Sequence, residues 1–389
     1  MTGILRLSSA NFKFRHEGAL GNKSKRIKYS AAFAPISDRS VKFTRGAVAS
    51  ACLVVAACDN SQTTNANKLA DIDNLADVKA NLAFTCVHKK IPAPDPEPDL
   101  LFNDARWLQK NNVLKQDKLM NAEIERLYRI AAEHGHYKAN VNLQNGSRQG
   151  LFELSAQEHI RLSQALIDRG LATGYYLIGI YLQRGSAGLR QDQEMSLRYI
   201  RMAADHGSAD AQEYLGNRLL QAPAAWDAGW QMIECAAQQG HPKAAQALAM
   251  KLKLEKKYPE AIRAFQLGVA AGNESSASFL RHGFLGQPKS DALYLAQQED
   301  LERAERYTII WRILARYSYA HPKVPEINEI VPLPPAPLPE WDGKLQWLEE
   351  RLANIPPEKP TEELIKRLAD EKKLEPATGK PMPGAAGFD

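Results

Sequence analysis

Nine histidines and four cysteines are the residues of this 389-residue chain best suited to bind a metal or to act as nucleophiles. Their spacing matches no H-E-x-x-H, G-x-S-x-G, C-x-x-C or phosphate-loop motif. His134, His206 and His241 flank glycines, where we expect them to cap helix ends rather than to hold a metal. No pair of carboxylates stands apart as an acid–base couple. We therefore predict a protein that is not an enzyme and that uses no metal or cofactor.

The residues around Cys58 predict a covalent modification instead. Lys42 and Arg45 precede an uninterrupted run of 11 small and apolar residues at 47–57, AVASACLVVAA. A membrane-spanning helix needs about 20 such residues, whereas the apolar core of an export signal needs roughly 7–15. The run ends in V-A-A followed by Cys58, which resembles the lipobox of bacterial lipoproteins. An ordinary signal peptide with a fortuitous cysteine is the alternative.

The lipobox resemblance implies that the leader is cleaved before Cys58 and that fatty acids such as palmitate are attached there. Several acyl chains hold a protein stably on a bilayer, whereas one chain holds it marginally. We expect a periplasmic protein anchored by lipid to the inner or the outer membrane, and Asp59 resembles an inner-membrane retention signal. The leader comprises residues 1–57. Residues 1–40 are not hydrophobic, and a GTG start at Val41 would leave them outside the protein, with 41–57 as the signal peptide.

The charge distribution argues against nucleic acid as a partner. The formal charge of the whole chain is +5, but residues 1–57 hold ten lysines and arginines and only two acidic residues. The remaining chain has 40 basic and 43 acidic residues, a net charge of about −3. Binding to a phosphate backbone needs a clustered basic face, and no run of that kind follows residue 57.

The five segments of the chain differ in composition. Residues 58–81 follow the leader as a polar, flexible tether, because this composition cannot bury a core. Residues 82–118 contain prolines at alternate positions up to Pro98, which predict an extended arm, followed by a first helix capped by Asp99. Residues 119–320 carry repeats and a capping helix from Glu299 to Ala320. Residues 321–389 hold a proline-rich stretch and C-terminal helices; we favour a strap across the fold over a free polyproline ligand.

A repeat near 34 residues determines the predicted fold. Five glycines recur at spacings of 35, 37, 33 and 32 residues, and three of them end the phrase Ala-Ala-x-x-Gly. A small residue follows each glycine by four positions and an aliphatic residue follows by eight. A large residue precedes it by seven, except at Ser163. This pattern predicts an all-α solenoid of stacked antiparallel helix pairs, each too small to bury its apolar face alone. The glycines are Gly135, Gly170, Gly207, Gly240 and Gly272.

The repeats resemble the Sel1-like family, which is related to the tetratricopeptide repeat. The best copies are A-A-D-H-G-S-A-D-A followed by Y-L-G at 214–216, and A-A-Q-Q-G-H-P-K-A. The resemblance covers about residues 120–285. The Gly135 copy lacks the leucine–glycine pair, and the Gly272 copy is degenerate. Outside the leader only Cys86 and Cys235 remain, and in an oxidising periplasm they could form a disulfide; two buried thiols are the alternative.

The order of segments along the chain resembles that of a group of Sel1-repeat lipoproteins. The features that carry this resemblance are the lipobox, the C-V-H segment and the W-D-G-K-L-Q-W-L stretch. Some of that group look like immunity proteins encoded beside type VI secretion phospholipase effectors. The resemblance implies a protein partner, a lipase-type toxin, and no small-molecule substrate. A periplasmic adaptor or scaffold for envelope or signalling complexes is the alternative. As partner-binding residues we name Tyr175, Tyr176, Tyr181 and Arg184.

Overall fold

The computed structural model describes residues 82–385. These residues form helices joined by turns, with one isolated antiparallel bridge between Leu374 and Pro381. The all-α prediction is therefore confirmed, whereas the leader, the tether and Cys58 lie outside the described residues. The helices are α2 Pro96–Asn112, α3 Lys118–Glu133, α4 Tyr137–Arg148, α5 Ala156–Asp168, α6 Ala172–Arg184, α7 Gln193–Asp205, α8 Ala209–Leu219, α9 Trp226–Gln238, α10 Pro242–Leu254, α11 Tyr258–Ala270, α12 Glu274–Gly283, α13 Leu301–Arg316, α14 Ile327–Ile330, α15 Gln346–Ala353 and α16 Glu362–Glu371.

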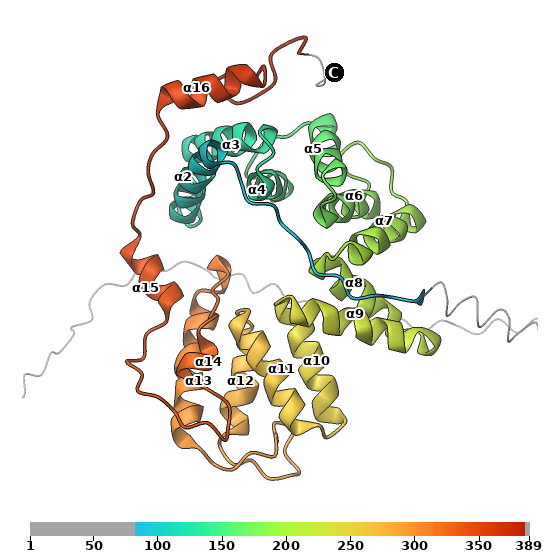
Figure 1. The fold of residues 1–389 in the computed structure, drawn as a ribbon, viewed down its shortest axis with the longest axis vertical. Coiled ribbons are helices and arrows are strands. Elements are labelled where there is room, and N and C mark those ends of the chain that lie inside the picture. Colours follow the sequence, from blue (N-terminus) through green and yellow to red (C-terminus); the bar gives the residue numbers. More distant parts are fainter. Residues whose placement is uncertain (1–81, 386–389) are drawn as a thin grey trace, which may run out of the picture. The chain divides into compact units, whose positions relative to one another are not determined.

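Helices α2 to α13 form six successive hairpins, and each hairpin packs against the next (Figure 1). The predicted solenoid of stacked helix pairs is thus confirmed. All five repeat glycines lie at the turns between hairpins, with φ between 71° and 93°. A residue with a β-carbon is strained in this left-handed region, whereas glycine is not. At Gly207 a β-carbon would also meet the backbone of His88 at 2.7 Å, so this glycine lets another segment pass close by.

The histidines beside these glycines have two different roles. His241 Nδ1 accepts a hydrogen bond from the Ala244 amide at 3.3 Å and caps the start of α10, and His206 Nδ1 lies 2.8 Å from the carbonyl oxygen of Met202 near the end of α7. Both cap helix ends, as predicted. His134 is the C-cap residue of α3, and its Nε2 also lies 2.8 Å from the Leu368 carbonyl of α16, a helix far away in the sequence.

Small residues inside the hairpins let the paired helices approach closely. A β-carbon on Gly179 of α6 would lie 2.6 Å from the Ile200 side chain of α7, and one on Gly216 of α8 would lie 2.8 Å from Ile233 of α9. In these two hairpins the large residue seven positions before the repeat glycine therefore packs against a glycine of the partner helix. Close packing of this kind holds the two helices of a hairpin together, whereas contacts with the neighbouring hairpins stabilise the stack.

The arm of residues 82–95 runs along the turns of the solenoid (Figure 1). A disulfide joins Cys86 of the arm to Cys235 of α9, with 5.5 Å between the two Cα atoms. The side-chain amide of Gln212 donates to the Val87 carbonyl at 3.0 Å, and the Lys89 amide donates to Gln239 Oε1 at 2.8 Å. These contacts fix the arm to the solenoid, so the surface beneath the arm is covered.

The expected start of the first helix was wrong by four residues. We predicted an extended arm up to Pro98 and a cap at Asp99, but α2 begins at Pro96, after Asp95 in extended conformation. Proline suits the first position of a helix, because that position has no backbone hydrogen bond to lose and because the ring fixes a helical φ. The alternate prolines therefore belong partly to the helix and only partly to the arm.

The C-terminal segment returns to the first hairpin. The proline-rich stretch lies against α13 as a strap, since Arg306 donates to the carbonyls of Ile330 and Pro339 at 2.7 and 2.6 Å. Beyond it, α16 lies beside α3 (Figure 1). Arg126 of α3 pairs with Glu362 of α16 at 2.7 Å. The end of the chain therefore covers the beginning of the solenoid.

Candidate partner-binding surface

The α4–α5 hairpin departs from the pattern of the other five. Its two helices contact each other far less than the helices of its neighbours do. Gln144 stands where the next two hairpins have glycine, and Ser163 stands where they have isoleucine. Gln144 is fully buried, and its Oε1 accepts from Ser163 Oγ at 3.0 Å and from Tyr181 OH at 2.8 Å. A polar contact thus replaces the close apolar packing of the other hairpins.

A chain of buried polar groups extends from this contact. His159 Nδ1 lies 2.9 Å from Tyr181 OH, and His159 Nε2 lies 3.1 Å from Ser147 Oγ. Asn140 donates to the Leu162 carbonyl at 3.0 Å, so the network joins α4, α5 and α6. Burial lowers the pKa of His159 and raises the pKa of Tyr181, because desolvation disfavours the charged form of each group. The network is therefore neutral at physiological pH.

The serine–histidine contact differs from a hydrolytic site in the second partner of its histidine. A catalytic histidine is oriented by a carboxylate on its second nitrogen, whereas His159 meets the Tyr181 hydroxyl there. Sulfur and nitrogen atoms of Cys86, His88 and Cys235 lie within 4.8 Å of one another, as ligands of a metal would. Both sulfurs belong to the disulfide, however, and a thiolate rather than a disulfide sulfur binds a metal. We assign neither group a chemical role.

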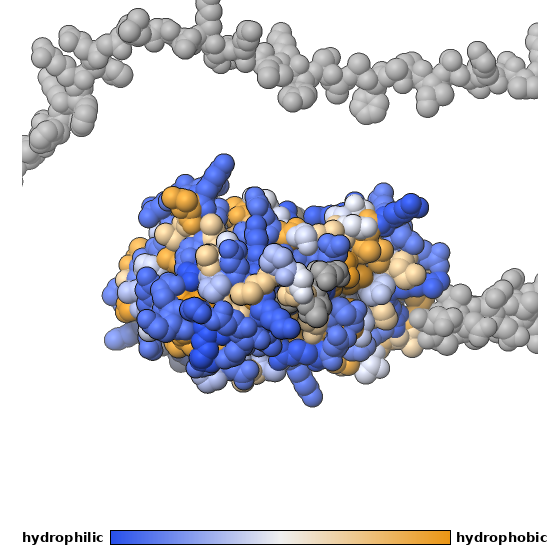
Figure 2. Space-filling view, turned by 90° about the horizontal axis from the view of Figure 1, so that it is seen from above, coloured by the Kyte–Doolittle hydropathy of each residue, from blue (hydrophilic) through white to orange (hydrophobic). Residues whose placement is uncertain are grey.

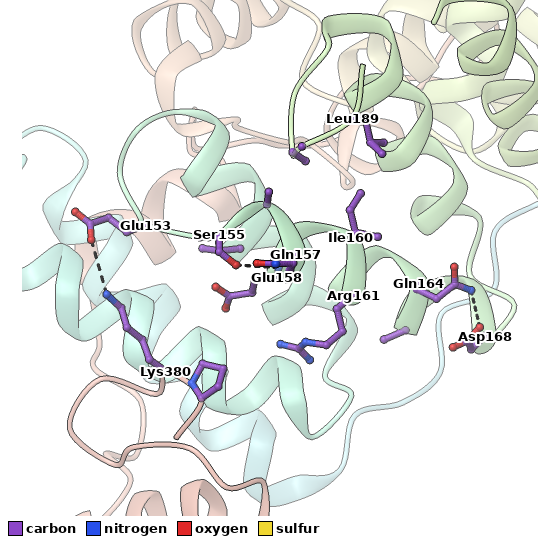
Figure 3. Close-up of a pocket in the computed structure, with 16 residues that line it drawn as sticks. Glu153, Ser155, Gln157, Glu158, Ile160, Arg161, Gln164, Asp168, Leu189 and Lys380 are labelled. Atoms are coloured by element: carbon purple, nitrogen blue, oxygen red, sulfur yellow. Dashed lines mark hydrogen bonds and ion pairs between the residues drawn. The ribbon is translucent and has the colours of Figure 1, made fainter. Parts of the chain in front are cut away.

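A groove of about 1290 Å³ lies over α5, and we call it the α5 groove (Figure 3). Its walls are the loop between α6 and α7 on one side and the C-terminal bridge region on the other. The Lys380 ammonium and the Glu153 carboxylate face each other at one end, 3.8 Å apart (Figure 3). Apolar and polar groups line it in similar measure; they are Glu153, Leu154, Ser155, Ala156, Gln157, Glu158, Ile160, Arg161, Gln164, Ala165, Asp168, Ala187, Gly188, Leu189, Lys380 and Pro381.

Buried charges fix the position of α5 beneath this groove. The guanidinium of Arg129, which is 1% exposed, pairs with Glu158 of α5 at 2.6 Å and with Glu125 at 2.7 Å. It also donates to the backbone carbonyls of Glu153 at 2.7 Å and Thr378 at 3.2 Å. One arginine of α3 therefore connects the floor of the groove to its C-terminal wall. A well-fixed groove loses less entropy when a partner binds.

The four residues named as partner-binding do not form one surface. Tyr181 is only 1% exposed and belongs to the buried polar network, so its assignment was wrong. Tyr175 and Tyr176 are half-buried against the core of the next hairpin, and burial raises the pKa of Tyr176 to about 12. Only Arg184, at the end of α6, is exposed. Helical spacing placed these tyrosines on one helix but could not show that the helix faces its neighbours.

On the face seen in Figure 2, apolar residues are interspersed among hydrophilic ones. Scattered apolar residues are usual on the surface of a folded protein. Within residues 82–385 no helix has both the length and the apolar composition that a bilayer span requires.

The fold and the groove define a helical-repeat solenoid protein with a surface suited to binding another protein. Among solved structures the chain is similar to Pseudomonas aeruginosa 5086 (PA5086), with 29% identity and a TM-score of 0.50, over 65% of this chain and 96% of that one. It is also similar to two proteins titled immunity proteins from Pseudomonas aeruginosa. Pa5087 has 27% identity over 66% and 96% of the two chains, and PA5088 has 26% identity over 65% and 95%, each with a TM-score of 0.50.

These likenesses confirm the resemblance to immunity proteins that the sequence suggested. In addition, a family described as a domain of unknown function, DUF6396, matches residues 276–382. The matched region runs from α12 through the proline-rich strap to the bridge region that borders the α5 groove. No curated protein matches the sequence.

Proposed function

We propose that this chain is an immunity protein that binds a toxin and neutralises it. The observation that carries the proposal is its likeness to two immunity proteins over almost their whole length, at 26–27% identity. A stacked-hairpin scaffold supports the proposal physically, since such scaffolds bind proteins through extended surfaces rather than through small catalytic pockets. Occlusion of the toxin needs only affinity and shape, so the protein requires no chemistry of its own.

We further propose that the protein acts in the periplasm, held to a membrane by acyl chains on Cys58. The lipobox-like sequence before Cys58 supports this location. The disulfide between Cys86 and Cys235 supports it as well, because disulfides persist in oxidising compartments such as the periplasm. Anchoring would raise the local concentration of the protein against a toxin that acts on the same membrane. A phospholipase delivered by type VI secretion is the toxin that fits this placement.

The α5 groove is the surface that we assign to the toxin. Its volume of about 1290 Å³ suits a protruding part of a partner protein, and Arg129 holds its floor and its C-terminal wall in place. Exposed side chains on its floor, such as Gln164 and Ala165, could be changed without disturbing the core. Replacement of Ala165 by arginine would place a long charged side chain in the groove and hinder docking.

Periplasmic co-expression with a phospholipase effector of type VI secretion tests the proposal. We expect the wild-type protein to restore growth and the Ala165→Arg variant to fail, while Arg184→Glu, which changes an exposed residue outside the groove, restores growth as wild type does. Lack of rescue by the wild-type protein would contradict the immunity function and favour an adaptor role. Rescue by Ala165→Arg would show that the toxin binds elsewhere. A Cys58→Ala secreted form separates the effect of anchoring from that of binding.

A further inference from the structure

A second cleft, of about 640 Å³, lies where the C-terminal part of the chain meets the first hairpin. We call it the basic cleft. One wall comes from α2, α4 and the turn between α2 and α3, and the other comes from residues 319–321 and Arg351 of α15. Its lining consists of Phe102, Arg106, Gln109, Lys110, Asn112, Val113, Gln116, Asn121, Lys138, Asn142, Asn145, Gly146, Gln149, Leu151, Tyr319, Ala320, His321 and Arg351.

Every residue of this lining that carries a full charge is positive. Arg106, Lys110, Lys138 and Arg351 line the cleft, and neither aspartate nor glutamate does. Among residues 82–385 none of the four forms an ion pair, whereas most arginines on α3, α7 and α13 do. Glu350 lies at the outer edge, where it lines a smaller adjoining pocket and its carboxylate accepts from Gln346. Four cations that share one cleft repel one another, and an anion between them would relieve that repulsion.

The side chains of the cleft are held in place without an anion. Arg351 stacks on Tyr319 and Trp347, with its guanidinium carbon 5.5 and 5.6 Å from the ring centres. Arg106 Nη1 donates to Gln109 Oε1 at 2.8 Å, and Lys138 lies 6.0 Å from the ring centre of Phe102. A guanidinium group has five N–H donors and an ammonium group has three, so these contacts do not use all of them. Pre-positioned donors bind an anion with less loss of conformational entropy than flexible surface lysines do.

The environment of Lys110 shows the same excess of positive charge. Its pKa lies below the ordinary lysine value because burial disfavours the ammonium ion and because Arg351 and Arg106 repel it, with Glu350 opposing the shift. The amides of Asn142, Asn145 and Gln149 border the cations on the α4 side and can donate to further oxygens. The volume lies in the range of small-ligand sites, which is roughly 300–1000 Å³.

We propose that the basic cleft binds a ligand that carries phosphate, either a soluble phosphate compound or the headgroup of an anionic lipid. Phosphate offers several anionic oxygens at once, which suits two guanidinium groups and two ammonium groups better than a single carboxylate does. The proposal is independent of the immunity function, because it uses neither the α5 groove nor the solenoid turns. It assigns a role to the junction between the two ends of the chain.

Calorimetric titration of the full chain, carrying Cys58→Ala to remove the lipid, tests the site with inorganic pyrophosphate at fixed ionic strength. In parallel, flotation compares vesicles of phosphatidylglycerol with vesicles of phosphatidylcholine. The test variant is Arg106→Gln with Lys138→Gln, since both side chains are exposed and the fold does not depend on their charge. The matched control removes two exposed cations elsewhere, by Arg218→Gln with Lys243→Gln.

We expect the wild type and the control to bind a phosphate probe alike, and the test variant to bind it at least about tenfold more weakly, as expected when two charge-assisted contacts are lost. Binding of pyrophosphate alone identifies a soluble ligand, and binding of phosphatidylglycerol vesicles alone identifies a headgroup. The proposal is overturned if the wild type binds neither probe. It is equally overturned if the control loses as much affinity as the test variant, because the binding would then depend on net charge and not on the cleft.

Discussion

Ser163 of α5 donates a hydrogen bond of 3.0 Å to Gln144 of α4, at the place where the next hairpin packs Ile200 against Gly179. In α4–α5 the large residue, Gln144, lies on the first helix and the small residue, Ser163, lies on the second, which reverses the arrangement of the next hairpin. Both residues are also polar. Because Gln144 is too large for the close approach that glycine permits, α4 and α5 stand apart. Tyr181 fills part of the space and donates a second hydrogen bond to the same oxygen.

Substitutions of Gln144 and Ser163 that restore the repeat pattern should have non-additive effects on the free energy of unfolding. We expect Gln144→Gly alone to lower the free energy of unfolding by about 1–3 kcal/mol, because Ser163 and Tyr181 lose a buried acceptor. Addition of Ser163→Ile should recover part of that loss, because isoleucine can pack where the glycine leaves room. Urea unfolding of both single variants and the double variant measures the coupling. Additive effects would contradict the view that the two residues act as a pair.

Removal of the disulfide should destabilise the protein and release the arm. Cys86 and Cys235 close a loop with a sequence separation of 149 residues, and disulfides of this kind stabilise by about 2–5 kcal/mol, mainly by restricting the unfolded chain. We expect reductant to lower the Tm of the wild type and to leave the Cys86→Ser/Cys235→Ser variant unchanged. Thermal melts with and without reductant, together with non-reducing peptide mapping, check this. An unchanged Tm of the wild-type protein after complete reduction would refute the prediction that the disulfide stabilises the fold.

His159 should make stability depend on pH below neutrality. Burial lowers its pKa in the folded protein from an ordinary value of 6.5, so the unfolded chain binds more protons than the native one as the pH falls. The stabilisation is fully present above pH 6.5 and decreases below it, by at most about 1.4 kcal/mol per pH unit. Denaturant titrations of the wild type and of His159→Gln between pH 7 and 5 should diverge. Parallel curves would show that His159 contributes nothing to the dependence.

Replacing the buried Arg129 should be far more harmful than replacing an exposed arginine. Arg129→Met leaves Glu125 and Glu158 buried without a cation, and such a loss costs about 3–5 kcal/mol. The matched control, Arg198→Met, removes an exposed ion pair with Glu194 and should cost less than about 1 kcal/mol. Chemical denaturation compares the two. Limited proteolysis should also cut the C-terminal region of Arg129→Met sooner, because Thr378 loses its contact.

Much of the fold could be predicted from the sequence because it depends on local periodicity. The repeat glycines predict turns between helices. The small and aliphatic residues at fixed distances from these glycines predict stacked hairpins. Two departures from the pattern, Gln144 in place of glycine and Ser163 in place of a large residue, are visible in the sequence. Their meaning required the structure, since only there do the two side chains face each other.

The sequence by itself determined that helices pair and stack, because each hairpin is specified by residues fewer than forty positions apart. Only the tertiary structure decided which surfaces are open. In the structure Tyr181 is buried and the arm lies against the turns. Arg351 and Arg106, which are more than two hundred residues apart in the sequence, line the same cleft. Contacts between distant segments leave no periodic signal, because they depend on the summed curvature of all the intervening hairpins.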